Sequence, residues 1–276
     1  MSRILAAALV VIVAGCAGRA SFPNLTPESP LTVTGRIHRP KGPGPFPAVV
    51  LLHGCDGIDS GTRRWARWLS ERGYLSLIVD SFSPRGFKEV CTFGGPDIER
   101  TARFDDAFGA LQYLQSLPFV DPRRIAAIGW SHGGVYAIAA INGPSLARAR
   151  ARGVMMPAIG FTASVALYPG GCFSLVDELV VAPLLLLIGG ADDWTPQGPC
   201  LEMVEKMKRR GAEASITVYP DAYHYFDVPD QPFTTLPDVA NRNKPGGCCG
   251  ATVGYHPEAA ADASRRIEAF LARHLK

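Results

Sequence analysis

The chain has 276 residues, of which 47% are hydrophobic and 19% are charged, and its formal net charge is +3. This length and apolar content suffice for one large domain with a well-filled core. The small and scattered net charge argues against nucleic acid as a partner.

The N-terminus has the pattern of an export signal. Arg3 precedes an apolar run over 4–13 that is too short to span a bilayer as a helix. The run ends in Val13-Ala14-Gly15-Cys16, which resembles a bacterial lipobox. We therefore predict a signal peptide over 1–15, lipidation of Cys16 and a tether over 16–30. We accordingly expect the protein in the periplasm or at the cell surface, anchored to the membrane. The alternative is an ordinary cleaved signal or a buried segment.

Beyond the tether, strand and helix patterns alternate along the chain. Unbroken apolar runs such as 47–52 suit central strands that helices bury on both faces. We predict strands at 31–38, 47–52, 74–80, 124–130, 162–168, 183–188 and 214–219, and helices at 61–72, 97–117, 133–141, 196–210 and 256–276. Between the helix at 133–141 and the strand at 162–168, we predict an arginine-bearing insertion at 144–159. The alternation predicts one α/β domain over 31–276 with a mostly parallel sheet, whose functional residues lie outside the strands' carboxyl ends.

A candidate nucleophile follows the predicted strand at 124–130. The sequence Gly129-Trp130-Ser131-His132-Gly133 has the Gly-x-Ser-x-Gly pattern, which places serine on a tight turn between a strand and a helix. Such a turn lifts the hydroxyl above the sheet, close to a helix N-terminus that favours an oxyanion. The motif alone is weak, but its position between a strand and a helix supports Ser131 as the nucleophile.

A serine hydroxyl needs a base, and the base needs an acid that orients it. In this arrangement the acid and then the histidine follow the serine in sequence. His224 follows the last predicted strand and is preferred over His256 and His274, which lie at the start and near the end of the closing helix. Asp192 follows the strand at 183–188 and is preferred as the acid over Asp193, which suits a helix cap or a loop contact.

Two backbone N–H groups should stabilise the oxyanion of the reaction. One belongs to His132, the residue after the nucleophile. The other should come from the loop after the strand at 47–52, where His53-Gly54 makes the Cys55 N–H the candidate.

Four motifs together resemble the dienelactone hydrolase family. They are His53-Gly54 after a buried strand, Gly-Trp-Ser-His-Gly-Gly at 129–134, Gly-Ala-Asp-Asp-Trp-Thr-Pro at 190–196 and Tyr-His-Tyr-Phe-Asp at 223–227. The resemblance implies the α/β-hydrolase fold and cleavage of small-molecule esters or lactones through an acyl-enzyme, without a metal or organic cofactor. The chain departs from the family at Ser131, where typical members carry cysteine. It also differs in its predicted export signal and its many cysteines.

The same resemblance suggests a substrate-binding residue. Family members hold the substrate carboxylate with arginine, and Arg85, after the strand at 74–80, lies at a similar position. The alternative is a loop arginine that pairs with a neighbouring acid.

Six cysteines remain after Cys16, an even number that fits disulfides in an oxidising compartment. Cys55 and Cys91 both follow strands whose carboxyl ends should be neighbours, and Cys172 and Cys200 are similarly placed. We therefore predict the disulfides 55–91 and 172–200. Cys248 and Cys249 could bond to each other or stay reduced, and no spacing indicates a metal site.

The sequence thus predicts a serine hydrolase of small esters or lactones. A peptidase or thioesterase of the same fold is an alternative, because the triad does not distinguish these acyl groups. A catalytically silent surface protein that only binds ligands is the other, because a fold does not guarantee chemistry.

Overall fold

The structure is a computed structural model that describes residues 17–99, 101–175 and 179–276. The predicted signal peptide and Cys16 lie outside the described residues. Over those residues, no helix has both the length and the apolar character needed to cross a membrane.

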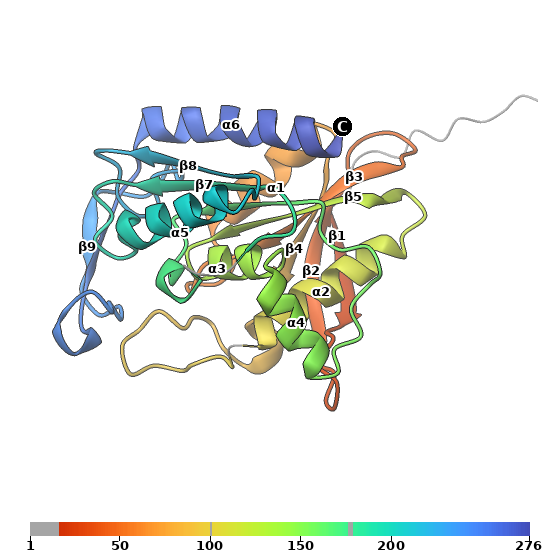
Figure 1. Ribbon diagram of the computed structural model, residues 1–276, viewed down its shortest axis with the longest axis horizontal. Helices are drawn as coiled ribbons and strands as arrows, with labels where there is room; N and C mark the ends of the chain where they lie inside the picture. Colours follow the sequence, from red (N-terminus) through yellow and green to blue (C-terminus); the bar gives the residue numbers. More distant parts are fainter. Residues whose placement is uncertain (1–16, 100, 176–178) are drawn as a thin grey trace, which may run out of the picture.

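Eight strands form one twisted sheet at the centre of the molecule (Figure 1). They are β1 (Ala17–Pro23), β2 (Thr32–His38), β3 (Phe46–Leu52), β4 (Leu75–Asp80), β5 (Val120–Trp130), β6 (Ala163–Leu167), β7 (Leu184–Gly189) and β8 (Ala214–Tyr219). Their order across the sheet is β1-β2-β4-β3-β5-β6-β7-β8. All pairs from β4 to β8 are parallel, whereas β1 and β2 are antiparallel to their neighbours. This confirms the predicted mostly parallel α/β sheet.

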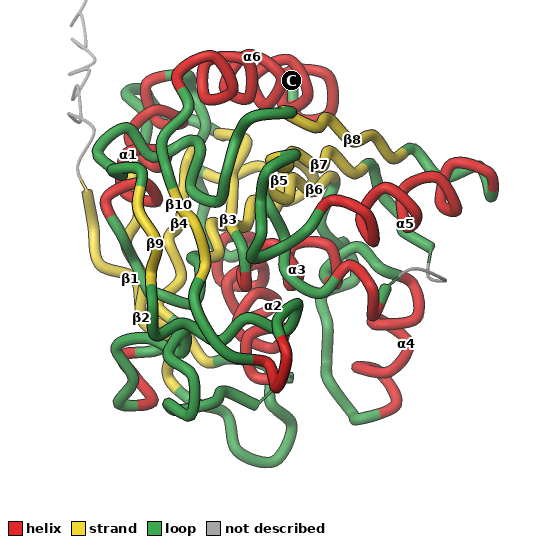
Figure 2. The backbone as a smooth tube through the Cα atoms, turned by 90° about the vertical axis from the view of Figure 1, so that its left-hand side faces the viewer, coloured by secondary structure: helices red, strands yellow, loops and turns green. Residues whose placement is uncertain are grey.

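Helices cover both faces of the sheet, as Figures 1 and 2 show. They are α1 (Ser60–Glu71), α2 (Ala102–Gln115), α3 (His132–Ala139), α4 (Gly143–Ala151), α5 (Gln197–Arg209) and α6 (Pro257–Leu275). α1 and α6 lie on one face, and α2, α3 and α5 on the other. Every residue of β3 is consequently buried, which explains its unbroken apolar sequence.

The register of the parallel strands brings their carboxyl ends to one edge. Leu52 at the end of β3 lies opposite Gly129 of β5, and Trp130 of β5 lies opposite Leu167 of β6. The loops that follow β3, β5, β6, β7 and β8 therefore meet above this edge, where the fold predicts functional residues.

Several parts of the chain differ from the sequence prediction. The helix predicted at 97–117 begins only at Ala102, the strand predicted at 124–130 begins at Val120, and the predicted insertion contains most of α4. Residues 17–23, predicted to be part of a tether, form β1 and pair with β2 over their whole length, so β2 is not an edge strand. The buried side chains of Ala20 and Phe22, two residues apart on one face, explain this pairing. After β8, the hairpin of β9 (Thr234–Leu236) and β10 (Ala251–Val253) extends beyond the main sheet (Figure 1).

Candidate active site

Ser131 lies on a strained turn between β5 and α3. Its φ and ψ angles are +50° and −116°, values that a residue with a side chain rarely adopts. The turn requires glycine at position 133, because a Cβ atom there would lie 2.0 Å from the Leu52 carbonyl oxygen. The backbones of the β3 loop and α3 are therefore in direct contact next to the serine, as expected for a nucleophile turn.

Asp192 and His224 form a buried pair at the same edge of the sheet. Asp192 follows β7 and His224 follows β8, and the His224 Nδ1 and Asp192 Oδ2 atoms are 2.7 Å apart. Both side chains are fully buried. Because Nδ1 donates to the carboxylate, Nε2 is the free acceptor of the ring. Nε2 is buried and has no hydrogen-bond partner among the described residues, so it can take a proton from a hydroxyl.

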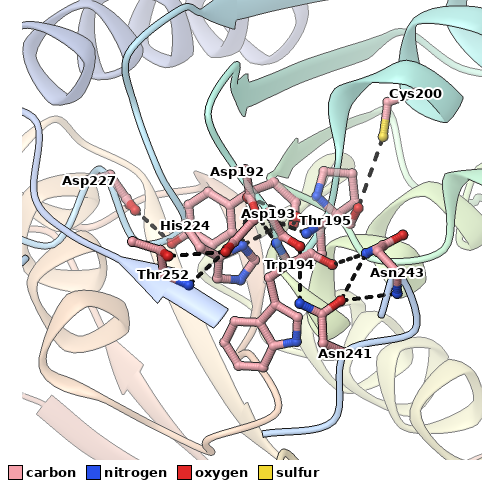
Figure 3. Close-up of polar contacts among 12 residues, drawn as sticks. Asp192, Asp193, Trp194, Thr195, Cys200, His224, Asp227, Asn241, Asn243 and Thr252 are labelled. Carbon is pink, nitrogen blue, oxygen red and sulfur yellow. Dashed lines mark hydrogen bonds and ion pairs between the residues drawn. The ribbon is translucent and has the colours of Figure 1, made fainter. Parts of the chain in front are cut away.

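The loop after β7 holds the Asp192 carboxylate in place. Its Oδ1 accepts hydrogen bonds from the backbone N–H groups of Trp194 and Thr195 at 2.9 and 2.8 Å. Its Oδ2 accepts a third from the Thr195 hydroxyl at 2.9 Å. Figure 3 shows these contacts around Asp192 and His224. A carboxylate fixed by three donors can orient the imidazole and stabilise its protonated form.

Asp193, the less favoured acid of the pair, faces away from the histidine. Its carboxylate binds Thr252 of β10, and its carbonyl accepts a hydrogen bond from the Asn241 amide at 3.0 Å (Figure 3). Asn243 binds the Trp194 carbonyl at 2.8 Å in the same way. These hydrogen bonds attach the segment after His224 to the loop that carries Asp192.

Aromatic rings surround the imidazole. The ring centres of Tyr168 and Trp194 lie 4.4 and 4.8 Å from that of His224. Asp227 is buried next to these rings. Its carboxylate accepts hydrogen bonds from the Tyr168 hydroxyl at 2.6 Å and from the indoles of Trp65 and Trp130 at 2.7 and 3.0 Å. Burial raises the pKa of this carboxyl. The sequence alone indicates no role for Asp227, although it belongs to the 223–227 motif.

The predicted oxyanion donors lie on the two loops that meet beside Ser131. Outside the regular elements of the described chain, neither the Cys55 nor the His132 N–H donates to a backbone carbonyl. Cys55 forms a disulfide with Cys91, and its carbonyl accepts a hydrogen bond from the Val90 N–H at 2.7 Å. The Cys55 backbone is therefore held from two sides, with its N–H left open for a ligand.

Two further disulfides are present in the described residues. Cys172 pairs with Cys200, which joins the loop after β6 to α5. Cys248 pairs with Cys249, one of the two possibilities that the sequence left open.

Arg85 forms an ion pair with a neighbouring carboxylate and does not contact the triad. Its Nη1 and Nη2 atoms bind the two carboxylate oxygens of Asp106 at 2.8 and 2.9 Å, and Nη1 also donates to the Ser81 carbonyl at 2.7 Å. Arg85 lines a groove together with Asn24 and Phe87, and none of the triad residues lines that groove. The pairing with a neighbouring acid, the alternative to substrate binding, is the arrangement found.

Sequence relatives cover this chain to different extents. It is 33% identical to esterase FrsA of Klebsiella pneumoniae (strain 342) over 113 residues, 38% of this chain and 24% of the esterase. It is 25% identical to acylamino-acid-releasing enzyme 2 of Oryza sativa subsp. japonica over 227 residues, 70% of this chain and 29% of that enzyme. It is 23% identical to a probable 2-oxo-3-(5-oxofuran-2-ylidene)propanoate lactonase of Bradyrhizobium sp over 197 residues, 69% of this chain and 77% of that protein. The chain thus spans less than a third of the first two proteins.

A solved structure and a family profile cover nearly the whole domain. The structure of a dienelactone hydrolase-like promiscuous phosphotriesterase, P91, from metagenomic libraries superposes with a TM-score of 0.67 and 19% identity. The match covers 95% of this chain and 100% of the other, and it confirms the α/β-hydrolase fold. The profile of the dienelactone hydrolase family matches residues 33–275. The chain therefore belongs to the dienelactone hydrolase family.

Proposed function

We propose that this protein is a serine hydrolase that cleaves small carboxylic esters or lactones through an acyl-enzyme. The observation that carries the proposal is the buried His224–Asp192 pair, whose free Nε2 atom lies at the sheet edge that also presents Ser131. The names of the esterase and lactonase relatives and the family membership support this class of chemistry.

In the proposed reaction, the Ser131 oxygen attacks the substrate carbonyl carbon while His224 Nε2 takes the hydroxyl proton. The electron pair of the C=O bond moves to the oxygen, and the N–H groups of Cys55 and His132 stabilise this oxyanion. The pair then returns, the bond to the alcohol oxygen breaks, and the alcohol takes the proton from His224. Water repeats the sequence on the Ser131 ester, which releases the acid and restores the serine.

The polar segment after α3 favours small substrates. This segment, predicted to be an insertion, carries α4, whose arginines at 148 and 150 make it unlike a long apolar lid. Hydrolysis of amides is the second candidate, supported by the acylamino-acid-releasing relative. The two are distinguished by rates on matched ester and anilide substrates with the same acyl group.

We further propose that the protein is exported and anchored by lipid at Cys16, on the strength of the N-terminal sequence. Expression of the full chain in a bacterium should place it in the detergent phase after Triton X-114 partition. The Cys16→Ala variant should move to the aqueous phase, and equal partition of both would contradict lipidation.

The catalytic proposal is tested with p-nitrophenyl acetate and a fluorophosphonate probe. Wild-type protein should turn over the ester and become labelled on Ser131. Ser131→Ala should lose about a thousandfold or more of kcat and all labelling. Full activity in this variant would refute Ser131 as the nucleophile, and a folded wild type that is inert to all esters, lactones and amides would favour a ligand-binding protein.

A further inference from the structure

A buried arginine on α2 contacts both loops that supply the oxyanion donors. Arg103, in the first turn of α2, is fully buried. Its Nη2 donates to the His53 carbonyl at 2.6 Å, two residues before Cys55. Its Nη1 lies 3.0 Å from Nδ1 of His132, the residue that supplies the other N–H. One guanidinium thus joins the ends of β3 and β5 beneath the candidate oxyanion site.

The imidazole of His132 is neutral in this contact. Burial and the Arg103 charge lower the pKa of His132 to about 3. A neutral ring accepts at the Nδ1 atom that faces Arg103, so the hydrogen bond fixes Nε2 as the protonated nitrogen. This ring also packs against Tyr136 in a T-shaped arrangement, with the ring centres 5.2 Å apart. Arg103 therefore fixes the side chain of the residue that directly follows the nucleophile.

No carboxylate of the described residues forms an ion pair with Arg103, although the charges of Asp106 and Asp56 act on it from a greater distance and raise its pKa. Among the described ion pairs, its neighbours Asp105 and Asp106 bind Arg152 and Arg85 instead. The rings of Phe82 and Tyr136 lie 5.1 and 5.3 Å from its guanidinium carbon, and its Nε is buried without a partner. Burial lowers the pKa of Arg103 to about 10, so it remains charged at neutral pH.

A buried cation without a contacting anion is costly for the resting fold. The attraction between this cation and negative charge that develops nearby during a reaction offsets that cost, because charges interact strongly in a low-dielectric region. Packing alone would be served better by an apolar side chain of similar length. The placement of Arg103 thus favours a role in the reaction over one in stability.

We infer that Arg103 is a positioning residue of the oxyanion site: it ties the Cys55 loop to His132 and holds both N–H groups for the developing oxyanion. This inference rests on the proposed serine hydrolase function. It concerns a residue that touches neither the substrate nor the triad, and it acts through the peptide after His53 and the side chain of His132.

The test compares Arg103→Met, Arg103→Lys and a matched control, Arg152→Met. Arg152 also binds α2, through Asp105 at 2.7 Å, but it contacts no residue of the site. Each folded protein is assayed with p-nitrophenyl acetate for kcat and KM. It is also titrated with phenylboronic acid, whose boron bonds to the serine oxygen and becomes a tetrahedral anion that mimics the oxyanion intermediate.

Arg103→Met should lower kcat by about 10- to 100-fold, with KM changed by less than about twofold. The affinity for the boronic acid should fall by a similar factor, because the anionic adduct uses the same donors. The acid limb of the pH profile should not move, because Arg103 does not contact His224 or Asp192. Arg103→Lys keeps the charge but can hold only one of the two loops, so its kcat should be intermediate. Arg152→Met should unfold at lower temperature with unchanged kcat.

Wild-type kcat and boronic acid affinity in Arg103→Met would overturn the inference while leaving the proposed function intact. A reduced kcat with unchanged boronic acid affinity would also overturn it. If Arg103→Met does not fold, Arg103→Lys decides by the same two measurements. A wild type that hydrolyses no ester and binds no boronic acid overturns the proposed function itself, and this inference with it.

Discussion

Asp193 accepts two hydrogen bonds from Thr252, one from its backbone N–H at 2.8 Å and one from its hydroxyl at 3.0 Å. The preceding residue, Asp192, faces the opposite way and binds His224 at 2.7 Å. Two adjacent carboxylates thus serve different parts of the molecule. One orients the candidate base, and the other attaches β10 to the loop that carries the acid.

This division predicts different effects for two matched substitutions. Asp192→Asn keeps the shape but disrupts the orientation and tautomer of His224, so kcat on p-nitrophenyl acetate should fall by about a thousandfold or more. Asp193→Asn should retain kcat within about tenfold and lose about 1–3 kcal/mol of unfolding free energy, because Thr252 loses charged acceptors. Steady-state kinetics and urea unfolding measure the two effects. The reverse pattern would make Asp193 the catalytic acid.

Two neighbouring glycines should differ sharply in their tolerance of alanine. A Cβ on Gly133 would meet the Leu52 and His53 carbonyl oxygens at 2.0 and 2.4 Å, so Gly133→Ala must displace the β3 loop and should abolish labelling by fluorophosphonate. A Cβ on Gly134 would meet Pro169 first, at 3.0 Å, and Gly134→Ala should keep measurable labelling. Equal labelling of both variants would contradict the close contact of the two loops.

The two long-range disulfides form a second matched pair. Their cysteines are 36 and 28 positions apart in the sequence, so the loss of either should reduce stability by a similar amount, about 2–4 kcal/mol. Only the first includes the residue proposed to supply an oxyanion donor, Cys55. The Cys55→Ser/Cys91→Ser variant should therefore lose kcat as well as stability, whereas Cys172→Ser/Cys200→Ser should mainly lose stability. Thermal unfolding and ester hydrolysis below both melting temperatures separate the effects; equal losses of kcat would rule out a special role for the Cys55 loop.

Asp56 should make stability depend on pH. The residue as a whole is exposed, but desolvation of its carboxyl, together with the neighbouring Asp59 charge, raises the pKa of this group from 3.8 to about 7. The native state therefore holds a proton that the unfolded chain releases between about pH 4 and pH 7, and this contribution to stability is lost as pH rises through that window.

Replacing the carboxyl with an amide removes this dependence. Asp56→Asn should raise the melting temperature relative to wild type at pH 8, and the gain should shrink toward pH 4. Asp230→Asn, at an exposed position, is the control for the loss of one carboxyl from the surface. A pH-independent difference between Asp56→Asn and wild type would argue against the shifted carboxyl.

Most of the sheet could be predicted because burial on both faces leaves a plain signal. The apolar run at 47–52 and its counterparts at 74–80 and 183–188 form β3, β4 and β7 with small changes of boundary. The strand β1 is not predictable in this way because, of residues 18–23, only Ala20 and Phe22 are buried, and such a short alternation next to a predicted export signal resembles a linker.

The candidate site was predictable where residues follow strands and less so elsewhere. Ser131, Asp192 and His224 each come after the carboxyl end of a strand, so the topology alone brings them to one edge. Arg103 lies inside a helix, where arginine ordinarily faces solvent, and no local pattern indicates that it is buried. Likewise, the acid that pairs with Arg85 is 21 residues further along the chain, and only the packing of α2 against the sheet brings the two together.

The pairing of β1 with β2 changes what an N-terminal anchor would do. A flexible linker over residues 16–30 would have a root-mean-square end-to-end distance of about 20 Å, which would separate the domain from its attachment point by that distance. Because the strand begins at Ala17, an acyl group on Cys16 would leave almost no slack. The domain would then be held next to the bilayer surface, with no flexible arm between the two.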